Sequence, residues 1–493
     1  MLWLVPPTPS TDLNYNVPFS GMTQSEEDAG LLQDVTVARA GMRQAVREWK
    51  QQVLAAERWR WPLGNPLARS SWRASWRGGN LLKRVSEKMD DSGDSLVLAE
   101  GDGEVLLPLR QAHEQLERYR ELMERLFVRL LDPKWREYLS TSAVAAKEFR
   151  FEYKSGLARR RERQVEHVFR FEVVCALFTL ALCKLNLGSA LLQAAADVEE
   201  GAEAEVTACT RKQNEAAQWY RESSGIFHFL STRMCAGLLV DVESERVLCE
   251  LHPLVSLALS HTALGLAYWV AVQRAEAQQL SPLTLSRLSL GAAETLRSAA
   301  TQWTQVLHEP VPAMVQGVKL GSPPTSACYA AVELLQALCR ARALYYRTVH
   351  LRAHETGGKG MRGLCVRLTE GAAEALAPDR LASWLRDGGD ALPISSGLQS
   401  SLTAWRRRID ELRQRCWRDN DMVFMEVVPP SLPEWTDTDV VYPFERPPFV
   451  FPSAAAAAHS VVVNGMVATG QVAEHTIPSL QAMIATGGAK ARR

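Results

Sequence analysis

The chain has 493 residues, of which 46% are hydrophobic and 23% are charged, as in ordinary globular proteins. Lys+Arg and Asp+Glu both number 56, so the net charge is zero and a globally basic nucleic-acid-binding protein is disfavoured. The nine cysteines are scattered and contain no C-x-x-C pair, so we expect reduced thiols and neither a disulfide framework nor a zinc site.

The N-terminal part combines an extended lead with a helix and an unusual loop. We expect residues 1–14, which are rich in proline, to be extended, and Ser25 to cap a helix that runs to about Arg58. The loop that follows interleaves indole and guanidinium groups, namely Trp59, Arg60, Trp61, Arg69, Trp72, Arg73, Trp76 and Arg77. Such groups suit the interface of an anionic membrane. The alternative is that the tryptophans pack on helices and the arginines are solvated.

The next elements are a predicted hairpin, a helix and a strand. A Gly/Asp-rich stretch at 99–105 is consistent with the turn of a short hairpin. From Leu109 to Leu130 apolar residues recur at mostly three- and four-residue spacing, which predicts an amphipathic helix. At 149–154 aromatic and charged residues alternate, which predicts a strand and hence a small β-sheet near the N-terminal part.

The remainder is predicted to be almost entirely helical. The segments are 163–198, 208–240, 250–277, 283–307, 324–355, 361–377 and 395–420. Long helices joined by short loops favour a mostly α, TPR-like helical solenoid, although no strict 34-residue consensus is present. Polar residues interrupt the apolar runs at 171–192 and 254–272, so we expect buried core helices and no membrane spans.

Motifs for catalysis or cofactor binding are not found. The chain has no G-x-S-x-G elbow, and its glycine-rich "ETGGKGMRG" lacks the P-loop spacing. His350 and His354 stand four residues apart but without the third ligand that a metal site needs. We therefore expect no catalytic residue, metal, cofactor, small-molecule substrate or nucleic acid, while catalysis by a group outside these motifs is left open.

Six segments in order resemble the Bro-one domain family, the family of ALIX, BROX and rhophilin. They are "NVPFSGMTQSEED", "FRFEYKSGL", "FRFEVVCALFTLALCKLNLGSAL", "AAQWYRESSGIFHFL", "LVSLALSHTALGLAYWVAV" and "WRDNDMVFMEVVPPSLP". The last resembles the family's closing helix followed by Asp-Asn-Asp, an aromatic residue, Val-Pro and an extended return arm. The sequence departs from the family at "TALGLAY", where the family has an Ala-Gln-Glu core, and at 58–108, which looks expanded.

The resemblance implies a boomerang-shaped Bro-type domain over 15–450, whose return arm spans about 427–450, followed by a low-complexity and disordered tail at 451–493. It also implies a non-enzymatic adaptor whose concave face binds the C-terminal amphipathic helix of an ESCRT-III subunit, of the Snf-seven or charged multivesicular body protein type. Such a protein would be cytoplasmic and recruited to endosomal membranes. The layout resembles a stand-alone protein of the BROX type without its prenylation signal.

By position, the family's apolar groove corresponds to the end of the helix at 250–272 and the first half of the next. That suggests Tyr268 or Trp269, then Leu285 and Leu288, as residues that contact the partner helix. The alternative is that these four side chains are ordinary core between helices. Two other functions stay open: a Bro-domain scaffold in pH or Rho signalling, and a peripheral membrane protein that acts through its Trp/Arg loop.

Overall fold

The structure is a computed structural model. The described residues are 8–9, 26–59, 101–130, 151–155, 163–166, 169–196, 203–235, 248–308, 323–354, 361–380, 396–436, 439–442, 444–449 and 451.

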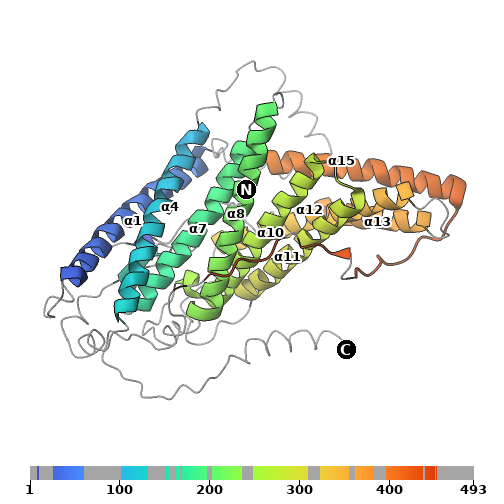
Figure 1. Ribbon diagram of the computed structural model, residues 1–493. Coiled ribbons are helices and arrows are strands. Elements are labelled where there is room, and N and C mark those ends of the chain that lie inside the picture. Colours follow the sequence, from blue (N-terminus) through green and yellow to red (C-terminus); the bar gives the residue numbers. More distant parts are fainter. Residues whose placement is uncertain are drawn as a thin grey trace, which may run out of the picture.

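The described part is a row of long helices in chain order (Figure 1). They are α1 (Glu26–Trp59), α4 (Gly101–Leu130), α7 (Phe169–Ala196), α8 (Glu203–Phe229), α10 (Pro253–Ala277), α11 (Pro282–His308), α12 (Pro323–His354), α13 (Met361–Ala375) and α15 (Ser396–Asp419). Each helix packs on the next one along the chain, from α1 against α4 to α13 against α15. An array in which elements contact mainly their neighbours is a solenoid, so the predicted mostly α solenoid is confirmed.

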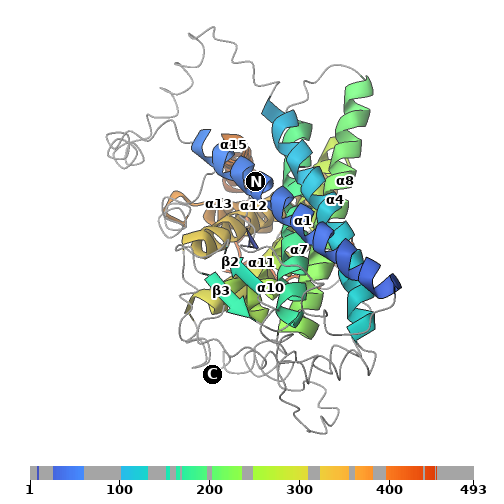
Figure 2. The ribbon, with the colours of Figure 1, turned by 90° about the vertical axis from the view of Figure 1, so that its left-hand side faces the viewer.

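A small antiparallel sheet lies beside this row. Its strands are β1 (Thr8–Pro9), β2 (Phe151–Lys154) and β3 (Arg163–Glu166), in the order β1-β2-β3, and β2 packs on α7 (Figure 2). The strand predicted from alternating aromatic residues is therefore confirmed as β2. The predicted helix 163–198 was wrong at its start, because Arg163–Glu166 pairs with β2 and the helix begins only at Phe169. That pairing is a tertiary contact, which helical periodicity does not report.

The hairpin predicted at 99–105 was also wrong. Residues from Gly101 onward form the first turns of α4, and Pro108 lies within that helix. The helix therefore begins eight residues before the amphipathic pattern that starts at Leu109, and it includes a stretch with poor intrinsic helix propensity. Leu109 itself is fully buried, so packing of the apolar stripe outweighs the local glycines.

Helices α7 and α10 are long and apolar enough to cross a membrane by length and composition alone. In the structure, 94% and 83% of their most apolar windows are buried against other helices. Both are thus core helices, as the polar interruptions in their sequences indicated. A helix that is hydrophobic all round must be covered on every side, and α7 is covered by α4, α8 and the sheet.

Two polar clusters cross-link the N-terminal helices inside this apolar core. The buried Arg39 of α1 donates from Nε to Oε1 of Glu172 in α7 at 2.8 Å, and the Tyr119 hydroxyl of α4 donates to the same oxygen at 2.6 Å. Lys184, one of the residues that interrupts the apolar run of α7, lies 2.8 Å from carboxylate oxygens of both Glu117 and Glu222. Since a buried charge is tolerated only when it is paired, these contacts allow α7 to carry charges in the core.

Candidate partner-binding surface

The return arm begins at a built turn after α15. A π-helical turn (Asn420–Phe424) ends at Met425, whose φ of 49° is left-handed. The side chain of Asn420 closes the turn: its Nδ2 donates to the Glu426 carbonyl at 2.9 Å, and its Oδ1 accepts from the Glu426 N–H at 3.1 Å. The Glu426 carboxylate in turn accepts from the first backbone amides of α13, those of Arg362 and Gly363. A carboxylate at a helix N-terminus satisfies orphan donors and complements the helix dipole, so this segment fixes the arm on α13.

From this turn the arm runs back across the solenoid toward its N-terminal half. Helical glycines mark its path, because an ideal Cβ at each would collide with the arm: Gly363 with the Val427 carbonyl at 2.2 Å, Gly291 with the Val441 carbonyl at 2.2 Å, and Gly225 with the Pro447 carbonyl at 2.5 Å. The arm ends against α8 and α4: Phe449 packs on Phe229 of α8, and Phe451 packs on Phe127 of α4. The expected tail boundary was therefore wrong at Phe451, which is buried. The predicted return arm therefore packs along α13, α11, α10, α8 and α4.

Tyr268 of α10, a predicted groove residue, is a main anchor of the arm. Its hydroxyl donates to the Phe444 carbonyl at 2.6 Å, and its ring lies 6.1 Å from the rings of both Tyr442 and Phe444. Burial raises the pKa of Tyr268 to about 12, so the hydroxyl keeps its proton and stays a donor at every physiological pH.

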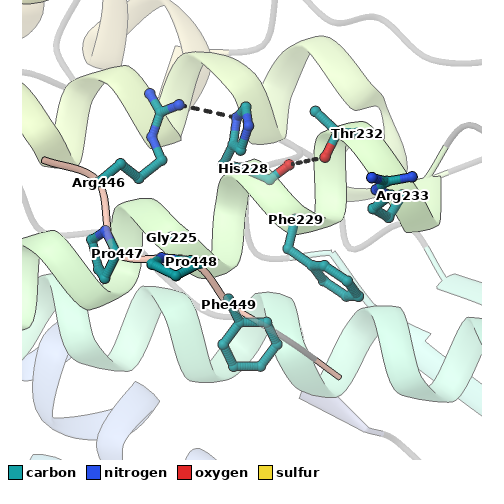
Figure 3. A pocket seen from close by; sticks show the side chains of 9 residues that line it. All are labelled: Gly225, His228, Phe229, Thr232, Arg233, Arg446, Pro447, Pro448 and Phe449. Atoms are coloured by element: carbon teal, nitrogen blue, oxygen red, sulfur yellow. Dashed lines mark hydrogen bonds between the residues drawn. The ribbon is translucent and has the colours of Figure 1, made fainter. Parts of the chain in front are cut away.

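Two residues beyond Phe444, the arm places Arg446 beside His228 of α8, and the two form a basic cluster (Figure 3). Arg446 donates from Nε to Oγ of Ser224 at 3.1 Å, and its Nη1 lies 3.1 Å from Nδ1 of His228. Arg446 and His228 line a hollow of about 400 Å³ together with Pro447 and Pro448. Burial lowers the pKa of His228 and the charge of Arg446 lowers it further, so Nδ1 accepts this hydrogen bond as neutral imidazole. Burial, followed by the charge of Arg446, lowers the pKa of nearby His261 to about 4.

Trp269, the neighbour of Tyr268, belongs to a different cluster. The Arg342 guanidinium of α12 lies between two indoles, 4.6 Å from the Trp269 centroid and 4.7 Å from that of Trp405 in α15. Arg342 also pairs with Glu276 of α10, which accepts from the Tyr346 hydroxyl at 2.7 Å. Burial lowers the pKa of Arg342 to about 10, which still leaves it charged at neutral pH. This cluster fixes α10, α12 and α15 to one another.

The other two predicted groove residues, Leu285 and Leu288, lie in the first turns of α11 and belong to the hydrophobic core. All four predicted side chains are at most 8% exposed, with Tyr268 and Trp269 engaged by the arm and by Arg342. The accessible apolar side chain next to them is Leu280, 40% exposed in the turn between α10 and α11. That the four contact a partner helix stays a prediction.

The Trp/Arg loop predicted as a membrane patch lies outside the described residues, apart from the backbone of Trp59 at the end of α1. Its role also stays a prediction.

Reasoning from sequence missed three groups that build this surface: Arg342, Arg446 and the glycines under the arm. A weak signal for the glycines was present, because "SSGIF", "LSLGAAE" and "MRGLC" each place a glycine inside a strong helical pattern, where it costs about 1 kcal/mol relative to alanine. A helical glycine that is retained despite this cost commonly marks a close backbone approach.

The described cysteines lie mostly in the hydrophobic core. The described cysteines are free thiols and mostly buried, and burial raises the pKa of Cys235 and Cys328 to about 12, so they are poor nucleophiles. Across the helices and arm that the structure describes, no group of three or more His, Cys, Asp or Glu side chains is arranged to hold a metal ion.

Comparisons with known proteins agree with this architecture. The family model of the BRO1-like domain matches residues 113–458. A search of solved structures found an ALIX BRO1 complex with CHMP4C (14% identity, TM-score 0.53, covering 92% of this chain and 97% of that one). It also found a structure that describes endosomal targeting by the Bro1 domain, with 13% identity and a TM-score of 0.53, covering 94% of this chain and 98% of that one. A third structure is ALIX in complex with a viral late-domain peptide, with 15% identity and a TM-score of 0.53, covering 92% of this chain and 50% of that one. The search of curated proteins found no match.

Proposed function

The chain belongs to the BRO1-like domain family, and from that premise we propose that it is a non-enzymatic adaptor that binds the C-terminal amphipathic helix of an ESCRT-III subunit. One observation carries the proposal: the fold aligns over 97% of an ALIX BRO1 chain whose structure contains CHMP4C. In the cell the protein would be cytoplasmic and recruited to endosomal membranes through such a partner.

The physical character of the solenoid supports this function. A helical partner needs a groove between helices with an apolar floor and charged rims, and a row of parallel and antiparallel helices presents such grooves. We place the groove at the start of α11, where Leu285 and Leu288 form the floor and Leu280 lies at the accessible edge. Tyr268 and Trp269 would then support the groove indirectly. Tyr268 holds the arm against α10, and Trp269 holds α12 against α10 through Arg342.

The test is fluorescence anisotropy of labelled C-terminal peptides from the ESCRT-III subunits, titrated with the full chain. Leu288→Ala is the test variant, and Leu107→Ala is the matched control for the chemical change, because Leu107 is 60% exposed on α4, outside the proposed groove. We expect saturable binding of at least one peptide, weakened about tenfold or more by Leu288→Ala, because a buried leucine at a contact contributes about 2 kcal/mol or more. Thermal unfolding of each variant separates a lost contact from a lost fold.

Two results would count against the proposal. If no peptide binds to a well-folded protein, the family fold serves another partner, as in pH or Rho signalling. If a peptide binds to Leu288→Ala as tightly as to the unmodified chain, the assignment of the groove to the start of α11 is wrong.

A further inference from the structure

The turn at which the arm leaves α15 exposes an unusual run of large apolar side chains. Met422, Val423, Met425 and Val427 are 70–87% exposed. Trp417, one turn earlier in α15, is 45% exposed, and Phe424 is covered only in part by the guanidinium of Arg362. We call these six residues (417, 422–425 and 427) the apolar tip. Single exposed apolar residues are normal, but a contiguous set such as this marks an interaction surface.

The geometry of the turn produces this exposure. The Asn420 side chain bonds both backbone groups of Glu426 and so closes the turn over the five residues between them, all of which are exposed. The left-handed Met425 and the anchored Glu426 carboxylate then direct the arm onto α13. The chain thus fixes the turn through polar contacts while its apolar side chains point to solvent.

The tip lies at the far end of α15, at one extremity of the helical row (Figure 1). It therefore protrudes, whereas a groove for a partner helix is concave. Two exposed arginines, Arg415 and Arg418, flank Trp417 on the last turns of α15, and neither has a carboxylate partner among the described residues. The exposed acid beside them is Asp421, since Asp419 is paired with Arg352. The unpaired exposed charge at the tip is therefore net positive.

We propose that the apolar tip inserts into the headgroup region of an anionic lipid bilayer. A protruding set of Met and Val side chains can enter the boundary between headgroups and acyl chains, an indole suits that boundary, and unpaired arginines bind lipid phosphates. The bilayer, which yields to a protrusion, is a better match for this shape than the preformed groove that a folded partner would have to supply. The tip is separate from α10 and α11, so the inference goes beyond the proposed helix-binding function.

The experiment is co-sedimentation of the full chain with phosphatidylcholine vesicles, with and without about 30% phosphatidylserine, at low and high salt. The test variant is Val423→Asp combined with Met425→Asp. Val37→Asp is the matched control, because Val37 is 50% exposed on α1, far from the tip along the chain. A second variant, Arg415→Gln with Arg418→Gln, tests the electrostatic part.

We expect the chain to bind vesicles that contain phosphatidylserine. The double aspartate variant should need a lipid concentration at least about tenfold higher for half-maximal binding. Val37→Asp should bind as the unmodified chain does, and the double glutamine variant should lose most of the salt dependence. The proposal is overturned if the chain does not bind these vesicles, or if Val37→Asp weakens binding equally. It is also overturned if analytical ultracentrifugation shows that the chain self-associates and that the double aspartate variant abolishes this, because a second copy would then cover the tip. Peptide binding by the double aspartate variant is expected to be normal, which keeps this test independent of the helix-binding one.

Discussion

Replacement of Gly291 by alanine should loosen the return arm. The added Cβ would lie 2.2 Å from the Val441 carbonyl oxygen, whereas ordinary van der Waals contact begins at 3.4 Å, so the arm must shift by about 1.2 Å at this point. Such a shift breaks the hydrogen bond from the Val441 amide to the Arg287 carbonyl, now 3.3 Å long, and strains the anchor at Tyr268.

The expected magnitude follows from opposing terms. Alanine stabilises a helix by about 1 kcal/mol relative to glycine. Overpacking costs about 1–3 kcal/mol, and each lost hydrogen bond costs about 1 kcal/mol. We therefore expect a net loss of about 1–3 kcal/mol in Gly291→Ala. Gly30→Ala in α1 is the control, because its Cβ would meet nothing within 4 Å, and we expect it to stabilise the chain by about 0.5–1 kcal/mol.

Chemical denaturation measures the free energies, and hydrogen exchange of residues 427–449 reports on the arm itself. Gly291→Ala should accelerate exchange in the arm while exchange in α1 and α4 stays unchanged. The reasoning would be refuted if Gly291→Ala were as stable as Gly30→Ala and left arm exchange as slow as in the unmodified chain.

Three further predictions concern buried polar groups. Arg342→Met should destabilise the chain by about 2–4 kcal/mol in urea denaturation, because the Glu276 carboxylate loses its cation. Adding Glu276→Leu should restore most of that stability, and no recovery in the double variant would contradict the reasoning. Glu426→Ala should cost about 1 kcal/mol and speed exchange at the start of α13, whereas an unchanged exchange rate there would show that the cap is dispensable. His261 has a folded pKa of about 4 against 6.5 when unfolded, so the unfolded chain takes up the proton first and stability should fall as the pH drops from 6.5 to 4. His261→Gln should flatten that part of the stability curve, and a curve of the same slope would exclude His261 as its source.

Much of the fold could be predicted from local pattern. The spacing of apolar residues located the long helices to within a few residues at most ends, and the polar interruptions in α7 and α10 indicated buried core helices. Motif resemblance predicted a return arm at about 427–450. The errors fell at 99–105 and 163–166, where packing of the apolar stripe of α4 and pairing with β2 override weak local preference.

The candidate sites were less accessible to sequence reasoning. Tyr268 and Trp269 are adjacent in the chain, yet one faces the arm and the other stacks on Arg342, because neighbours on a helix point in different directions. The tip falls within the segment "WRDNDMVFMEVVPPSLP" that carried the family resemblance, but its exposure was not predicted and accompanies the Asn420 and Glu426 contacts.

The sequence by itself determined the helices, their order and the presence of the arm, since each depends on periodicity and on residues close together in the chain. Only the tertiary structure decided which apolar side chains are buried and which are exposed. The cause is that burial depends on contacts between residues more than a hundred positions apart, such as Gly225 with Pro447, and no local pattern records those distances.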